Sequence, residues 1–224
     1  MRFTGLLTLI LLIFANQTSS QQKPCTDVWT GTITYQVTTK KKGTAENKLT
    51  FSHWNEDTFY ETKAELDGRR NEHGHQIASV RATAYENKEW GSRGKGVCYR
   101  ETDNSQAVRG EAHDNTTGFT ISFNPRTGEY SVLAPVIMVY ASGQHVVSSR
   151  VKGTCNNPYN KDFNQVDKID RYQLSDDAPA LVGKGRIDPA KPDEFSGTEI
   201  EEHDTPRGHK TVTIKWNLRR CAKQ

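Results

Sequence analysis

Residues 29–38 read WTGTITYQVT, and the strict alternation of this stretch decides the fold class. One set of alternating positions is apolar, aromatic or glycine: Trp29, Gly31, Ile33, Tyr35 and Val37. The positions between them are threonine or glutamine. Because successive residues of a β-strand point to opposite faces, this pattern predicts a strand with one face on a core and the other in water.

The same alternation recurs twice further along the chain. Residues 211–218 place valine, isoleucine, tryptophan and leucine on one face, and residues 119–123 alternate aromatic or isoleucine side chains with threonine and serine. Residues 125–128, with a proline and a glycine, predict a hairpin turn. Residues 57–66 are the nearest approach to a helix, but they suit a strand at least as well. We therefore expect an all-β chain, a single antiparallel β-sandwich, with a β-barrel as the alternative.

Two stretches lack this pattern and are expected to be long polar loops. Residues 156–170 are rich in asparagine and aspartate. Residues 176–195 contain three prolines, which flank a short predicted strand at residues 181–187. Long loops on a rigid β scaffold are frequent places for binding function.

The first twenty residues have the features of a secretory signal. A single positive charge at Arg2 precedes an apolar run of about ten residues, which is short of the roughly 20 that a membrane-spanning helix needs. Small polar residues follow, and cleavage fits best after Ser20. We expect a signal peptide at residues 1–20, a single β domain at residues 21–224, and no membrane insertion once the signal is removed.

All four cysteines lie in the expected mature chain, which predicts two disulfides. Cys25 and Cys98 lie near the starts of predicted strands, whereas Cys155 and Cys221 follow strand ends. Neighbouring antiparallel strands bring the start of one beside the end of the other. The favoured pairing is Cys25–Cys221 with Cys98–Cys155, because chain termini often lie close together. The alternative is Cys25–Cys155 with Cys98–Cys221.

The charge distribution excludes nucleic acid as a partner. The chain has 30 Lys+Arg against 27 Asp+Glu, and loss of Arg2 with the signal reduces the formal charge from +3 to +2. The only basic run, residues 40–42, precedes a glycine and suits an exposed hairpin tip. A nucleic-acid binder needs basic residues gathered on one face to neutralise phosphates.

The first polar loop suggests a calcium site. Within eleven residues it carries five side-chain oxygen donors: Asn160, Asp162, Asn164, Asp167 and Asp170. Calcium takes six to eight oxygen ligands, and alternating donors followed by a later carboxylate can wrap around it. The match to a helical calcium loop is poor, so any such site is irregular and weak. The alternative is a solvated loop whose side chains bond to their own backbone. No other cofactor is predicted.

Carboxylates and tryptophans offer a second kind of site. Glu199 and Glu201 share one strand face, where paired carboxylates could act on glycosidic bonds or could line a solvated edge. Trp54 and Trp90 stand among polar residues and could stack on a sugar or pack half-buried. Asn115 begins an Asn-Thr-Thr glycosylation sequon, which has meaning only in a eukaryotic secretory pathway.

Together these features favour a secreted or periplasmic, disulfide-stabilised β domain that is a non-catalytic binding or interaction module. Its partner is expected to be an extracytoplasmic ligand or protein. The alternatives are an extracytoplasmic carbohydrate-active hydrolase using Glu199 or Glu201, and a barrel that holds a small apolar ligand behind Trp29 and Trp216.

Overall fold

A computed structural model of the chain describes residues 28–156, 161–174, 181–205 and 208–221. These residues form eleven strands and no helix, so none of them belongs to a helix that could cross a membrane. The strands are β1 (Val28–Glu46), β2 (Thr50–Arg70), β3 (Gln76–Gly94), β4 (Cys98–Gly118), β5 (Thr120–Phe123), β6 (Glu129–Leu133), β7 (Val139–Gly153), β8 (Phe163–Leu174), β9 (Val182–Arg186), β10 (Glu194–Thr205) and β11 (Gly208–Cys221).

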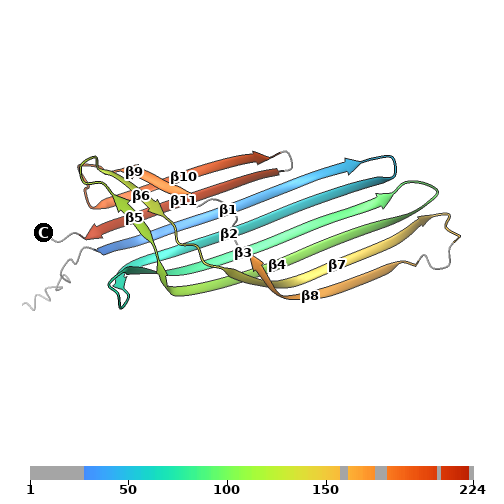
Figure 1. Ribbon diagram of the computed structural model, residues 1–224, viewed down its shortest axis with the longest axis horizontal. Helices are drawn as coiled ribbons and strands as arrows, with labels where there is room; N and C mark the ends of the chain where they lie inside the picture. Colours follow the sequence, from blue (N-terminus) through green and yellow to red (C-terminus); the bar gives the residue numbers. More distant parts are fainter. Residues whose placement is uncertain (1–27, 157–160, 175–180, 206–207, 222–224) are drawn as a thin grey trace, which may run out of the picture.

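Eight of the strands form one long, open antiparallel sheet (Figure 1). Their order is β10-β11-β1-β2-β3-β4-β7-β8, so β10 and β8 are the two edges. The all-β antiparallel prediction is confirmed. The barrel alternative is wrong, because β10 and β8 do not pair with each other.

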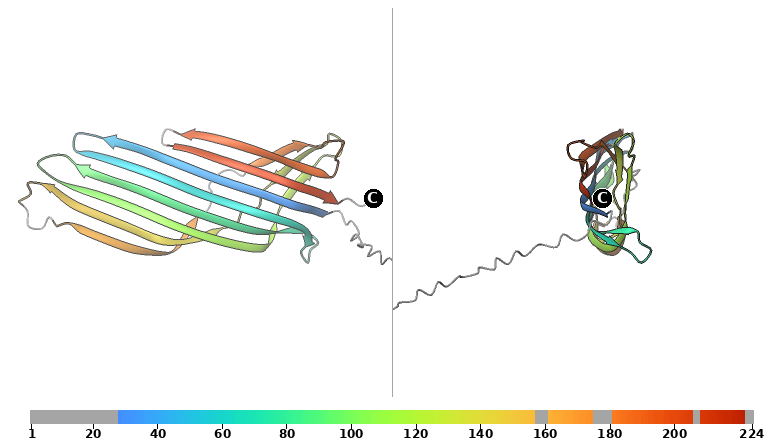
Figure 2. Two further views of the ribbon diagram at one scale, coloured as in Figure 1. Left: turned by 180° about the vertical axis from the view of Figure 1, so that it is seen from behind. Right: turned by 90° about the vertical axis from the view of Figure 1, so that its left-hand side faces the viewer.

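A small sheet of order β5-β6-β9 forms the second layer. It lies over one end of the large sheet, and the views from behind and end-on separate the two layers (Figure 2). We call the face of the large sheet that meets the small sheet the inner face. It carries Ile33, Tyr35 and Val37 of β1, all buried, as the alternation of residues 29–38 predicts. This arrangement is a sandwich in which the layers differ greatly in size.

An aromatic cluster fills the space between the two layers. The Phe195 ring packs edge-on against Trp29, with ring centroids 4.7 Å apart, and against Tyr130 at 4.9 Å. Trp216 Nε1 donates a hydrogen bond to Tyr130 Oη at 3.2 Å. Each such aromatic pair contributes about 0.5–1.5 kcal/mol beyond the area it buries. The core therefore sits at one end of the molecule, where the second layer is present.

The connection between β6 and β7 crosses the inner face and marks where the core ends. Tyr60 Oη on β2 donates to the Ile137 carbonyl at 2.6 Å and accepts from the Ile137 amide at 3.2 Å. The hydroxyl of buried Thr62 donates to the Pro135 carbonyl at 3.0 Å. These bonds hold the connection against β2 and give its Pro135 and Ile137 backbone groups hydrogen-bond partners.

Most of the strands expected from the sequence are confirmed. Residues 211–218 lie in β11, residues 57–66 in β2, and the turn at residues 125–128 joins β5 to β6 as a hairpin. The short strand expected within residues 181–187 is β9. The polar loop expected at residues 156–170 is wrong for residues 163–170, which form most of β8. Because β8 is an edge strand with a mostly exposed surface, it lacks the apolar alternation that identifies the others.

The disulfide Cys98–Cys155 is present, with the two Cα atoms 5.1 Å apart. Cys98 begins β4 opposite Gly153, near the end of β7, so the expected pairing of strand start with strand end is confirmed. The alternative pairing Cys98–Cys221 is thereby excluded. Cys25 lies outside the described residues, and its pairing with Cys221 stays a prediction. Cys221 ends β11 directly opposite Val28.

Candidate functional site

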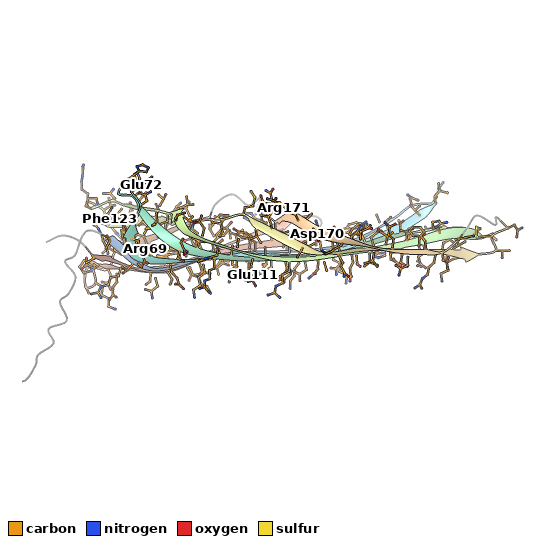
Figure 3. All side chains as sticks on the ribbon, turned by 90° about the horizontal axis from the view of Figure 1, so that it is seen from below. Arg69, Glu72, Glu111, Phe123, Asp170 and Arg171 are labelled. Carbon is orange, nitrogen blue, oxygen red and sulfur yellow. A yellow bond between two sulfur atoms is a disulfide. The ribbon has the colours of Figure 1, made fainter. Side chains whose placement is uncertain are left out.

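Beyond the Tyr60–Ile137 contact the small sheet no longer covers the inner face, and of the described residues only the end of β8, with Tyr172 and Leu174, reaches over it beside Glu86. The long strands continue there as a single sheet, visible edge-on at the right of Figure 3. We call this region the open inner face. Its side chains can be placed by strand register, since directly paired residues of antiparallel strands point to the same face.

A charged row crosses the open inner face from β1 to β8. The directly paired residues are Lys41, Glu56, Lys88, Gln106, His145 and Asp167. Lys41 Nζ lies 3.1 Å from Glu56 Oε1. Opposite charges on neighbouring strands stabilise a sheet modestly, by about 0.2–1 kcal/mol per pair.

Glu86, next to this row on β3, is the only buried charged side chain among the described residues. Its carboxylate accepts hydrogen bonds from Gln106 Nε2 at 2.9 Å and from Lys88 Nζ at 2.8 Å. Burial alone would lower the pKa of Lys88, but the hydrogen bond and negative charge of Glu86 outweigh it and raise that pKa. Burial and a hydrogen bond to Glu86 raise the pKa of Tyr172. Each oxygen of the buried carboxylate therefore has a partner, Gln106 on Oε1 and Lys88 on Oε2.

A pocket of about 510 Å³ lies where the charged row meets the covered core. Its lining combines charged side chains with aromatic and aliphatic ones, among them Lys41, Glu56, Lys88, Tyr172 and Leu174. Ligand sites typically combine apolar walls with a few fixed polar groups.

A second row, which we call the aromatic row, lies two residues from the charged row on every strand, on the side away from the covered core. Its directly paired members are Gly43, Trp54, Trp90, Asn104, Val147 and Gln165. A Cβ atom added to Gly43 would lie 2.2 Å from Trp54 Cζ2, so the Trp54 indole lies directly over the backbone of β1. The Trp90 ring extends the other way and stacks on His145, with centroids 5.5 Å apart and planes 11° from parallel. Both indoles are half-buried.

The expected calcium donors are not brought together. Asn160 lies outside the described residues, and Asp162 Oδ1 accepts the Val151 amide at 2.7 Å. The other three belong to β8, where Asn164 and Asp167 point to opposite faces. Asp167 accepts from Gln165 at 2.9 Å, and Asp170 lies 2.6 Å from Lys168 Nζ. No group of three or more metal-ligating side chains occurs in the described part of the chain. A strand cannot wrap alternating donors around one ion.

The candidate hydrolytic carboxylates lie away from the aromatic row. Glu199 and Glu201 share the inner face of edge strand β10, and Glu201 Oε2 lies 3.4 Å from His203 Nε2. Glu201 is level with Val37, six residues before Gly43 on β1, which corresponds to about 20 Å along the strands. These carboxylates and the indoles therefore do not form one cleft.

The space behind Trp216 is filled. A Cβ atom added to Gly197 would lie 2.3 Å from Trp216 Cζ2, and one added to Gly183 would lie 2.4 Å from Cζ3. The Trp216 ring therefore packs closely against both glycines and leaves no room for a ligand between them and the ring.

Comparisons with protein-family models, with curated proteins and with solved structures find no match to this chain. The polar neighbours of Trp54 and Trp90 mark these two residues in the sequence, but no sequence pattern reveals the row around them. The hairpin tip expected at residues 40–42 is wrong, because these residues lie inside β1, which continues to Glu46. Only the strand register brings Lys41 beside Glu56 and Lys88.

Proposed function

We propose that this chain is an exported, non-catalytic carbohydrate-binding protein and that the open inner face is its binding surface. The observation that supports this most directly is the aromatic row lying beside the charged row. A sugar ring has an apolar C–H face and a rim of hydroxyl groups. The indoles of Trp54 and Trp90 offer flat apolar surfaces on which the C–H face can stack. The carboxylate, ammonium and amide groups of the charged row offer acceptors and donors for the hydroxyl groups.

The charge balance favours an uncharged ligand. Lys41 is paired with Glu56 and Lys88 with Glu86, so these four residues contribute no net charge. A polyanion such as nucleic acid needs an excess of basic groups to release its counterions. A hydroxyl-rich neutral ligand can instead use the remaining donor and acceptor positions of each ion pair.

Export is supported by the signal-like residues 1–20 and by the Cys98–Cys155 disulfide, since disulfides persist mainly in oxidising compartments. Such a location would expose the protein to extracellular or cell-wall polysaccharides. Neither export nor polysaccharide binding at the open inner face requires a catalytic group.

The test measures retention of the secreted protein on insoluble cellulose and chitin and its titration with soluble β-glucan and mannan. We expect at least one neutral polysaccharide to bind, and Trp90→Ala to weaken that binding about tenfold, as loss of roughly 1.4 kcal/mol implies. The matched control is Tyr85→Ala, which removes an aromatic ring from the opposite face of the same strand. The proposal is wrong if none of the four polysaccharides binds, or if Tyr85→Ala weakens binding as much as Trp90→Ala.

A further inference from the structure

We infer that the ligand is a linear glycan that lies across the strands and contacts both indoles at once. This inference rests on the proposed carbohydrate binding and adds the length and direction of the bound chain.

The two indoles point away from each other. Trp54 and Trp90 are directly paired on β2 and β3, yet the Trp54 ring lies over β1 and the Trp90 ring reaches toward His145 on β7. Neighbouring strands are about 4.8 Å apart, so the rings are separated by two to three strand spacings, or roughly 10–14 Å. A single sugar ring is too small to contact both.

The direction follows from the two rows. The charged row runs parallel to the aromatic row at a distance of two residues along each strand, or about 7 Å. A chain lying across the strands keeps its ring faces on the indoles and one rim of hydroxyls along Lys41, Glu56 and Lys88 throughout. A chain lying along the strands would meet one indole only.

Gly43 acts as a positioning residue for this surface. Its missing Cβ lets the Trp54 indole lie flat on β1, whereas an added Cβ would approach three ring atoms within 2.2, 2.6 and 3.0 Å. Gly43→Ala therefore displaces the Trp54 ring from its position over β1 without removing the ring. Gly118→Ala is the matched control, because an added Cβ there meets nothing within 4 Å.

The experiment titrates oligosaccharides, from monosaccharide to hexasaccharide, of whichever polysaccharide binds best. We expect affinity to rise about tenfold once the chain spans both rings, from the gain of a second stacking contact. Gly43→Ala and Trp54→Ala should abolish that rise and leave binding of short chains through Trp90 intact, while Gly118→Ala behaves as wild type.

Equal affinity for monosaccharide and hexasaccharide, or an unchanged length dependence in Gly43→Ala, would overturn the inference while leaving carbohydrate binding in place. Failure of every saccharide to bind would overturn the proposed function and this inference together.

A separate observation concerns Asn115, and here we propose an N-linked glycan on its Nδ2 atom. Asn115-Thr116-Thr117 is the only such sequon after residue 20. Asn115 lies within the β-bulge of β4, where pairing with β3 shifts register. The residue is exposed, and Ser79 Oγ donates to its Oδ1 at 2.8 Å, so this bond leaves Nδ2 for the sugar.

The transfer needs a lipid-linked oligosaccharide pyrophosphate as donor, which a eukaryotic secretory pathway supplies. The anomeric carbon forms a bond to Nδ2 and its bond to the pyrophosphate breaks. The lipid pyrophosphate leaves, and the amide loses one proton. Ser79 is opposite Glu65 on β2, ten or more residues from the aromatic row, so the glycan would leave the open inner face accessible.

The test is secretion from yeast or insect cells followed by peptide mass mapping before and after amidase treatment. We expect conversion of Asn115 to aspartate on deglycosylation, no modification in Asn115→Gln, and retained modification in Thr117→Ser, which keeps the sequon. An unmodified Asn115 in secreted wild-type protein would overturn this proposal.

Discussion

Trp216 is held between two glycines, and replacing either with alanine should destabilise the fold measurably. The added Cβ at Gly197 would lie 2.3, 2.8 and 2.9 Å from three ring atoms, and the one at Gly183 would lie 2.4 Å from Cζ3. Because the ring is confined on both sides, it cannot move away from one glycine without meeting the other layer. Its Nε1 hydrogen bond to Tyr130 also fixes its position.

The expected cost of Gly197→Ala combines three contributions. Overpacking costs about 1–3 kcal/mol, and a strained or lost hydrogen bond to Tyr130 costs about 1 kcal/mol more. Alanine lowers the conformational entropy of the unfolded chain, which stabilises the folded state by roughly 0.5–1 kcal/mol. We therefore expect a net loss of about 2 kcal/mol in the free energy of unfolding, or a Tm lower by about 4–8 °C for a domain of this size.

Urea denaturation of four proteins tests the cause as well as the size of this effect. They are wild type, Gly197→Ala, Trp216→Phe and the double variant. A phenyl ring lacks the outer part of the indole, so Gly197→Ala should cost much less in the Trp216→Phe background. The same cost in both backgrounds would refute the packing argument, since the destabilisation would then not pass through the indole.

Three further predictions follow from particular contacts. Replacing Cys98 and Cys155 with serine should lower the free energy of unfolding by about 4 kcal/mol, as expected for a bridge between residues 57 apart, and equal denaturation midpoints for the two proteins would contradict this. Glu86→Gln should lower the free energy of unfolding, measured by denaturation, by about 1–3 kcal/mol, because it leaves partly exposed Lys88 without its carboxylate partner. An unchanged free energy of unfolding would contradict this and mean that solvent already screens the pair. A hydrogen bond to Asp204 raises the pKa of His209. The stabilisation that this pair gives the fold should therefore be present at acidic pH and be lost as the pH rises through the raised pKa. NMR titration of His209 should find the raised pKa absent in Asp204→Asn.

The sequence by itself determined the fold class through the alternation of residues 29–38 and 211–218. Such alternation records a local fact, namely which face of a strand meets apolar surface, and both stretches became strands with the expected faces buried. Strand polarity also limited the disulfides to two sets of pairings, and the structure decided for the set that contains Cys98–Cys155. It failed at β8, where an exposed edge strand needs no apolar face and so resembles a polar loop.

The tertiary structure alone decided how large each layer is and which polar residues stand side by side. Lys41, Glu56 and Lys88 are far apart in sequence and become neighbours only through the register of β1, β2 and β3. The same register sets Trp54 opposite Trp90, which the sequence had identified only as two separate tryptophans. Register depends on the length of each turn and on the summed fit of every cross-strand pair, so no single stretch of sequence encodes it. Residues near one another in the chain fixed the faces of the strands, and contacts between distant residues assembled the site.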